Sequence, residues 1–180
     1  MMKKFKLLMG MALALVAQQS NAQVEGVTKF PNPDLYKYVK METKHGDVVL
    51  RLYPDVAPQT VQAFLDRVNE GFYNGVYFHR VIPGFVAQGG DPTLVGRPAA
   101  NYTLPAEFSK LKHKRGTLAM ARVGHDIHSA STQFYISYGS HPHLDGQYTI
   151  FGEVETGMSA VDQINKGDKM IKLYQVNKTR

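Results

Sequence analysis

One arginine and one glutamine stand out in the apolar stretch that runs from Phe78 to Asp91. Arg80 precedes a Pro83-Gly84 turn, and Gln88 follows it. Because the neighbouring residues are typical of a core, we expect Arg80 to be withdrawn from water, which is costly unless the charge is paired or used. Gln88 is a ready partner. Arginine is always protonated and carries a rigid fork of donors, so it could stabilise a lone pair that develops on a substrate.

Histidines and cysteines define the other chemistries that must be considered. The chain has no cysteine, which excludes disulfides and thiol chemistry. Of its 7 histidines, His125 and His128 form one close pair and His141 and His143 another. These spacings match no standard zinc site, and no carboxylate–histidine arrangement suggests a metal-dependent hydrolase. We therefore predict that the protein uses no metal and no cofactor.

Four sequence blocks resemble the signature of the cyclophilins, the peptidyl-prolyl cis-trans isomerases. They are Phe78–Asp91, Gly116–Arg122, Ser131–Ile136 and Leu144–Gly152, and they occur in the family's order. The resemblance covers nearly everything after about Tyr38. It implies an enzyme that accelerates rotation about X-Pro bonds, a reaction that breaks no covalent bond and needs no cofactor.

The resemblance also implies roles for individual residues. Arg80 stands at the position of the catalytic arginine and Gln88 at that of the glutamine that holds it. In the twisted amide the prolyl nitrogen gains a lone pair, and a donor aimed at it would stabilise only the transition state. The implied substrate-binding residues are Phe85, Val86, Phe134, Tyr135 and Leu144 around the proline ring, Ala121 and Arg122 along the substrate backbone, and Gln133, His143 and Tyr148 at the rim.

Simpler interpretations exist for most of these residues. Three apolar residues could belong to an ordinary core, namely Phe85, Phe134 and Leu144. The two glutamines, Gln88 and Gln133, could be satisfied buried amides. Arg80 could be a structural ion-pair arginine. At the level of function, the alternative is a non-catalytic proline-peptide binding module or chaperone of the same fold. The joint presence of Arg80, Phe85, Gln88 and Gln133 favours the enzyme.

The sequence departs from the family pattern in four places. His143 replaces a tryptophan that many members carry, and Tyr135 replaces phenylalanine, so its hydroxyl needs a buried partner. Arg97–Asn101 replaces a glycine-rich loop. Arg122–Ser131 is longer than usual and contains two histidines. We expect these differences to affect substrate preference and inhibitor binding but not the fold.

The hydrophobic pattern predicts a mainly β protein. A hairpin is expected over residues 36–53, and an amphipathic helix begins near Pro58 and ends at Gly71. A second helix is expected over about 160–165. Further strands are predicted at 76–82, 85–88, 117–121, 134–137 and 149–154. Many short strands with two helices indicate a closed antiparallel β-barrel capped by two α-helices, and the resemblance supplies the number of eight strands.

The N-terminus is typical of a secretory signal peptide. Residues 1–22 contain a lysine-rich start, a short apolar run and small residues before a cut after Ala22. An uncleaved anchor is the alternative. We predict a flexible segment over 23–35 and one isomerase domain over 36–180.

Loss of the signal peptide removes three lysines and lowers the formal net charge from +6 to +3. A basic cluster at residues 110–115 is expected to be a solvated loop, so no nucleic-acid partner is predicted. The short, bacterial style of the signal favours the periplasm over eukaryotic secretion. The expected partners are proline-containing unfolded or partly folded polypeptides, and we expect a monomer without stable membrane association.

Overall fold

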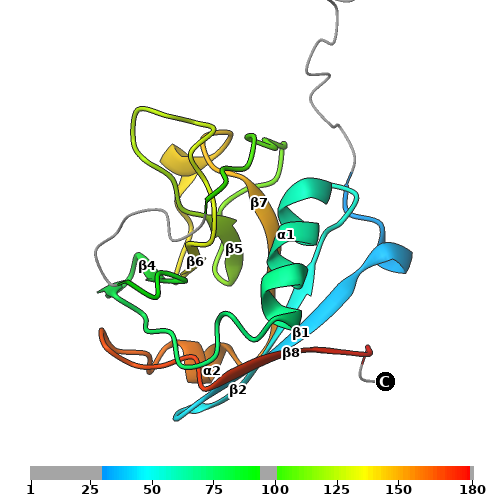
Figure 1. Ribbon diagram of the computed structural model, residues 1–180. Helices are drawn as coiled ribbons and strands as arrows, with labels where there is room; N and C mark the ends of the chain where they lie inside the picture. Colours follow the sequence, from blue (N-terminus) through cyan, green and yellow to red (C-terminus); the bar gives the residue numbers. More distant parts are fainter. Residues whose placement is uncertain (1–29, 94–100, 179–180) are drawn as a thin grey trace, which may run out of the picture.

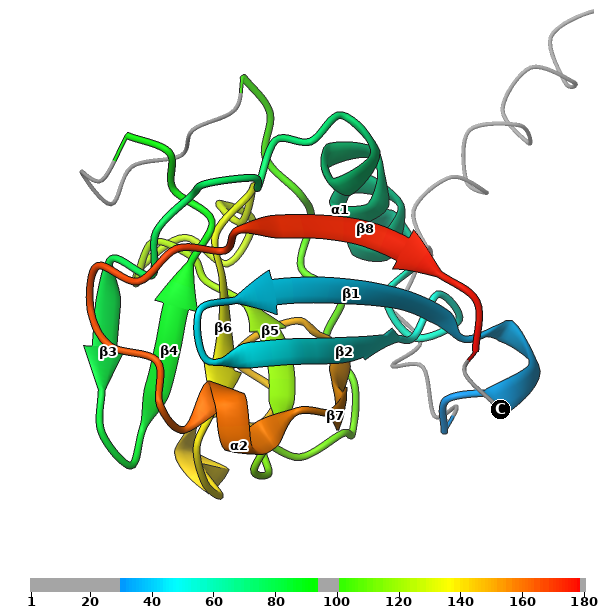
Figure 2. The ribbon, with the colours of Figure 1, turned by 90° about the horizontal axis from the view of Figure 1, so that it is seen from below.

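Eight antiparallel strands form one curled sheet in the computed structural model, which describes residues 30–93 and 101–178. The strand order is β3-β4-β6-β5-β7-β2-β1-β8 (Figures 1 and 2). The strands are β1 (Lys37–Thr43), β2 (Gly46–Leu52), β3 (Arg80–Ile82), β4 (Val86–Gly89), β5 (Thr117–Met120), β6 (Phe134–Ser137), β7 (Ile150–Thr156) and β8 (Lys172–Val176). The helices are α1 (Pro58–Asn69) and α2 (Met158–Val161), with 3-10 turns η1 (Pro33–Leu35) and η2 (Pro142–Leu144).

Several predicted features lie outside the described residues. These are the signal peptide at 1–22, residues 23–29 of the N-terminal segment, and most of the 97–101 loop. In the rest of the N-terminal segment, the side chain of Asn32 accepts a hydrogen bond from the Asp34 backbone and caps η1. No helix within residues 30–93 and 101–178 is long and apolar enough to cross a membrane.

The first hairpin forms as the sequence predicts. Strands β1 and β2 pair from Lys37–Leu52 to Thr43–Gly46. Gly46 closes the tight turn with a φ of 122°, a conformation that side chains beyond glycine rarely adopt. The Thr43 hydroxyl accepts a hydrogen bond from the His45 amide and donates one to the Gly46 carbonyl. Alternate residues of both strands face the core.

Helix α1 covers the core side of the curled sheet. Its apolar stripe, predicted from the spacing of four residues, is buried as expected. Phe64 from this stripe contacts Tyr73, Phe134 and Phe151, with ring centroids 5.1, 5.5 and 5.3 Å apart. These aromatic contacts join the helix to β6 and β7. Figure 2 shows α1 and α2 on opposite sides of the hairpin formed by β1 and β2.

The sheet is an open, curled half-barrel rather than the fully closed barrel expected from the sequence. Within residues 30–93 and 101–178, the edge strands β3 and β8 do not pair with each other. Instead, the irregular segments that precede them are joined by a bridge between Tyr77 and Lys169 and by backbone hydrogen bonds such as Phe78 N to Asp168 O, at 2.8 Å. The strand expected over 76–82 is therefore shortened to β3.

The second helix and the last strand also differ from the prediction. The helix expected over 160–165 begins earlier and ends after one turn, as Met158–Val161. Strand β8 was not predicted, because its sequence alternates only weakly and it pairs with β1 alone. Strand β8 is thus defined by its pairing with β1, which is distant in the sequence, rather than by a pattern in its own residues.

A buried carboxylate fastens the hairpin turn to the loop before β8. Asp168 accepts hydrogen bonds from Lys44 Nζ at 2.6 Å, His45 Nε2 at 2.7 Å and the Asn165 amide at 2.9 Å. Burial on its own raises the pKa of Asp168, but the hydrogen bonds from Lys44, Asn165 and His45 outweigh it and lower the pKa to about 2. The ionised carboxylate therefore stabilises the fold above the ordinary pKa of aspartate, and this contribution is lost as the pH falls towards 2.

We expect Asp168→Asn to lower the free energy of unfolding by about 1–2 kcal/mol at pH 7, measured by urea denaturation. The difference from the native protein should shrink to about half by pH 3. At that pH the Asp168 carboxyl is mostly protonated in the unfolded chain but still mostly ionised in the folded protein. Asp47→Asn is the matched control, since Asp47 pairs with Lys40 in an exposed position. A difference at Asp168 that does not change with pH would contradict the assignment.

Candidate functional site

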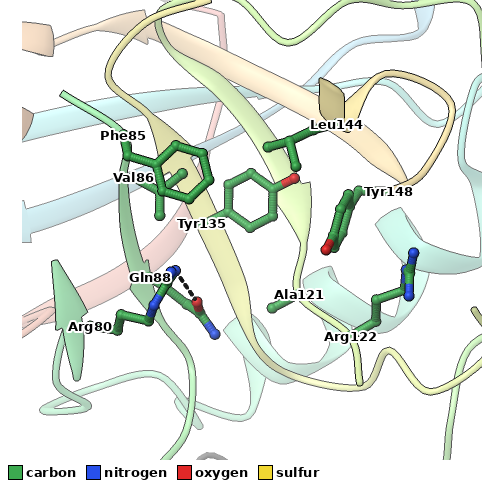
Figure 3. A pocket seen from close by; sticks show the side chains of 9 residues that line it. All are labelled: Arg80, Phe85, Val86, Gln88, Ala121, Arg122, Tyr135, Leu144 and Tyr148. Carbon is green, nitrogen blue, oxygen red and sulfur yellow. Dashed lines mark hydrogen bonds between the residues drawn. The ribbon is translucent and has the colours of Figure 1, made fainter. Parts of the chain in front are cut away.

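A pocket of about 250 Å³ lies on the sheet face that turns away from the main core (Figure 3). It is built over a small second apolar cluster whose buried members are Val86, Ala119, Tyr135 and Ile150. One face of the sheet therefore packs against the main core, and the other face forms the pocket. The lining residues are Arg80, Phe85, Val86, Gln88, Ala121, Arg122, Tyr135, Leu144 and Tyr148.

Arg80 begins a chain of side-chain hydrogen bonds along one wall. It pairs with Gln88 in the register of β3 and β4. Its Nη1 donates to Gln88 Oε1 at 3.2 Å, Gln88 Nε2 donates to Gln133 Oε1 at 3.1 Å, and Gln133 Nε2 donates to Asp91 Oδ2 at 3.3 Å. Asp91 is fully buried, and its other oxygen accepts two bonds from Thr93. This chain fixes the Gln88 amide so that its oxygen faces the guanidinium.

The prediction that Arg80 is withdrawn from water was wrong. Its side chain is exposed, because β3 is an edge strand and Arg80 points into the open pocket rather than into the core. Its guanidinium carbon lies 5.8 Å from the centre of the Phe85 ring. One side of the guanidinium is held by Gln88, and water can be displaced from the other by a ligand. An ion pair, the structural alternative, is absent at Arg80 within the described residues.

Apolar side chains form the rest of the cavity. In Figure 3, Tyr135 lies between Phe85 and Tyr148, with Leu144 beside its hydroxyl. The Tyr135 and Tyr148 rings meet edge to face, with centroids 5.9 Å apart. A cavity of this size and lining suits a small apolar ring held next to a cation.

Three of the predicted site residues do not line the pocket. Phe134 is a correction: it is fully buried in the main core against Phe64 and Tyr73, because successive residues of β6 face opposite sides of the sheet. Gln133 lies behind Gln88 and supports it. His143 is exposed outside the cavity and stacks on Phe85, with centroids 6.0 Å and planes 17° apart.

Arg122 shapes the far end of the pocket. Its Nε donates to the Gln147 carbonyl at 3.0 Å, and its Nη1 to the Gly124 carbonyl at 2.6 Å. The guanidinium also lies 4.7 Å from the centre of the Tyr148 ring. These contacts fasten the longer 122–131 loop to the rim. Backbone groups at Ala121 lie along the same wall, where the Ala121 amide donates to the Gln133 carbonyl.

The partner that the Tyr135 hydroxyl required is His113, which sequence reasoning missed. His113 Nε2 lies 2.9 Å from the Tyr135 oxygen, and His113 Nδ1 lies 3.1 Å from Asp145 Oδ1. His113 is 1% exposed, so it is an exception within the basic cluster at 110–115, whose lysines and Arg115 are solvated as predicted. Burial lowers the pKa of His113, although Asp145 opposes this effect. Only the unsatisfied hydroxyl of Tyr135 could have signalled such a partner.

Across residues 30–93 and 101–178, no group of three histidine, cysteine, aspartate or glutamate side chains could hold a metal ion. The arrangement can hold an apolar ring and offer a fixed donor beside it. Within the described residues, no serine, threonine, cysteine, aspartate, glutamate or lysine side chain lines the pocket.

Comparison with known proteins places this geometry in a family. Residues 38–178 match the model for "Cyclophilin type peptidyl-prolyl cis-trans isomerase/CLD". A probable peptidyl-prolyl cis-trans isomerase of Brucella suis is 48% identical over 143 residues, covering 73% of this chain and 72% of the relative. A peptidyl-prolyl cis-trans isomerase of Helicobacter pylori is 42% identical over 135 residues, covering 73% and 82%.

Solved structures share the fold. A Cryptosporidium parvum cyclophilin type isomerase, crystallised in the presence of the dipeptide Ala-Pro, superimposes with a TM-score of 0.73 at 27% identity. The match covers 78% of this chain and 99% of that one.

Proposed function

The chain belongs to the family of cyclophilin-type peptidyl-prolyl cis-trans isomerases, and we propose that its 250 Å³ pocket binds the proline ring of X-Pro segments in exported proteins that have not finished folding. The observation that carries the proposal is the position of Arg80 beside an apolar cavity lined by Phe85, Val86, Tyr135 and Leu144. A proline ring is small and apolar, and its amide nitrogen is the atom that needs a donor.

Arg80 acts on the twisted amide. Rotation about the X-Pro bond breaks amide resonance, at a barrier of about 18–20 kcal/mol, and the prolyl nitrogen becomes pyramidal with a localised lone pair. A guanidinium N–H directed at this lone pair binds the twisted state better than either planar state, which is what lowers a barrier. Gln88 holds Nη1 of the fork, so Arg80 is oriented before the substrate binds.

The substrate backbone lies along Ala121 and Arg122. Pairing through main-chain groups carries little information about neighbouring side chains, so the enzyme accepts many sequences around the proline. His143 and Tyr148 border the part of the substrate beyond the ring. The partners are thus proline-containing unfolded or partly folded polypeptides, and the folding step that they share is slow X-Pro isomerisation.

A protease-coupled assay on an Ala-Pro peptide, together with refolding of a protein limited by proline isomerisation, tests this function. We expect acceleration of both reactions. Binding of the peptide without acceleration of either would instead identify a non-catalytic proline-peptide binding module or chaperone of the same fold.

We propose that the N-terminal segment is a signal peptide that directs the enzyme to the periplasm. Its basic start, short apolar run and small residues before Gln23 support cleavage after Ala22. We expect the protein recovered from the periplasm of an expressing bacterium to have the intact mass of a chain that begins at Gln23. A mass that includes Met1, or one that begins well beyond Gln23, would contradict this cleavage site.

A further inference from the structure

The pocket floor contains a hydroxyl group bonded to a buried histidine. In the parts of the chain that the structure describes, the Tyr135 hydroxyl has His113 Nε2, at 2.9 Å, as its one hydrogen-bond partner. His113 lies in the loop before β5, and its Nδ1 is 3.1 Å from Oδ1 of Asp145, which follows η2. The hydrogen-bonded chain of Asp145, His113 and Tyr135 therefore joins two loops to β6 directly under the cavity.

The direction of each hydrogen bond follows from its partners. Oδ1 of Asp145 also accepts the His113 backbone N–H at 2.8 Å, so the carboxylate is an acceptor and His113 Nδ1 is the donor to it. A neutral imidazole that donates through Nδ1 accepts through Nε2. The Tyr135 hydroxyl must therefore donate its proton to His113. Burial lowers the pKa of His113, which favours this neutral form near pH 7.

We propose that His113 and Asp145 are positioning residues of the isomerase, which keep the Tyr135 hydroxyl proton turned away from the proline ring. This inference rests on the proposed function, in which the ring occupies the pocket. Without an acceptor at His113, the hydroxyl would leave an unsatisfied donor under an apolar ring. In the free enzyme water can satisfy that donor, whereas a bound ring excludes water. The loss is therefore felt in substrate affinity, while Arg80 continues to act on the amide.

Protonation of His113 tests the same arrangement without a mutation. Charged imidazole donates through both nitrogens, so it can no longer accept from Tyr135, and the hydroxyl must turn elsewhere. Affinity for prolyl peptides should then fall as the pH drops through the His113 pKa. The other charged or titratable groups that face His113 or Tyr135 are Lys112, Asp145, Arg122, His141, His143 and Tyr148.

Three variants separate positioning from a merely structural role, with kcat and KM measured on an Ala-Pro peptide between pH 4.5 and 8. His113→Leu should raise KM about fivefold to tenfold and leave kcat within about twofold. Adding Tyr135→Phe to His113→Leu should restore KM, because the hydroxyl that lacked an acceptor under the ring is then gone. His113→Gln keeps an acceptor but cannot titrate, so it should keep the native KM at pH 7 and lose the rise of KM at acidic pH.

Control variants identify which proposal fails. His143→Gln should retain the acid-side rise of KM, since His143 stacks on Phe85 and, within the described residues, makes no hydrogen bond to His113 or Tyr135. The inference is overturned if the double variant binds as weakly as His113→Leu, or if His113→Gln retains the acid-side rise. Phe85→Ala tests the pocket itself: an unchanged KM there would refute the proposed function. A raised KM in Phe85→Ala with no effect of the His113 variants would refute only the positioning role. If His113→Leu does not fold, His113→Gln decides alone.

Discussion

Arg80→Ala is expected to lower kcat/KM for an Ala-Pro peptide by at least tenfold, which corresponds to about 1.4 kcal/mol of barrier. In the proposed mechanism the lost N–H acts on the twisted amide, so kcat should fall more than affinity for the peptide. The fold should survive, because the Arg80 side chain is exposed and its hydrogen bond to Gln88 contributes little to the core. Thermal unfolding and a protease-coupled assay provide the two measurements.

Arg80→Lys is the matched variant for this prediction. Lysine retains the charge but replaces a planar fork with a point charge on a flexible stem, so it cannot bind Gln88 and the prolyl nitrogen in the same geometry. We expect it to fail nearly as badly as alanine. Turnover close to native in Arg80→Ala, with unchanged thermal stability, would refute the catalytic role.

Phe134→Ala should lower the free energy of unfolding by about 3–5 kcal/mol. Phe134 is fully buried, and its ring contacts Phe64 and Tyr73 edge to face at 5.5 and 5.6 Å. Its removal leaves a cavity between α1 and β6 that the sheet cannot close. The melting temperature should fall by roughly 10 °C or more.

A milder change separates this core role from substrate binding. Phe134→Leu keeps the chain folded and should leave KM within about twofold of native, because Phe134 faces away from the pocket. Leu144→Ala is the matched opposite: its half-buried side chain lines the pocket, so KM should rise with a small loss of stability. If Phe134→Leu raised KM as much as Leu144→Ala, Phe134 would contribute to substrate binding as well as to the core, and this prediction would be wrong.

Neighbouring residues in the sequence blocks show what could and could not be predicted. The blocks around Arg80 and Ser131–Ile136 identified the pocket, yet they could not separate Phe134 from Tyr135. All four residues of β6 are buried, since one face meets the core and the other the pocket. A strand buried on both faces has no alternation of polar and apolar residues to reveal which face is which.

Contacts between distant segments account for the other differences. His113 and Tyr135 are 22 residues apart, and Asp145 reaches His113 from a separate turn. Nothing in the local pattern of a lysine-rich loop indicates that its one histidine is buried. The exposure of Arg80 likewise follows from the position of β3 at a sheet edge, which is a property of strand order rather than of the apolar residues around it.

We propose that Arg80 recognises the twisted amide rather than the planar peptide. Exchange NMR on an Ala-Pro peptide measures both quantities in one sample, since it gives the dissociation constant and the rate at which cis and trans forms interconvert on the enzyme. We predict that Arg80→Ala lowers the interconversion rate at least tenfold and changes the dissociation constant by no more than a few fold. A native interconversion rate accompanied by a large loss of affinity would refute this role, because Arg80 would then bind the ground state alone.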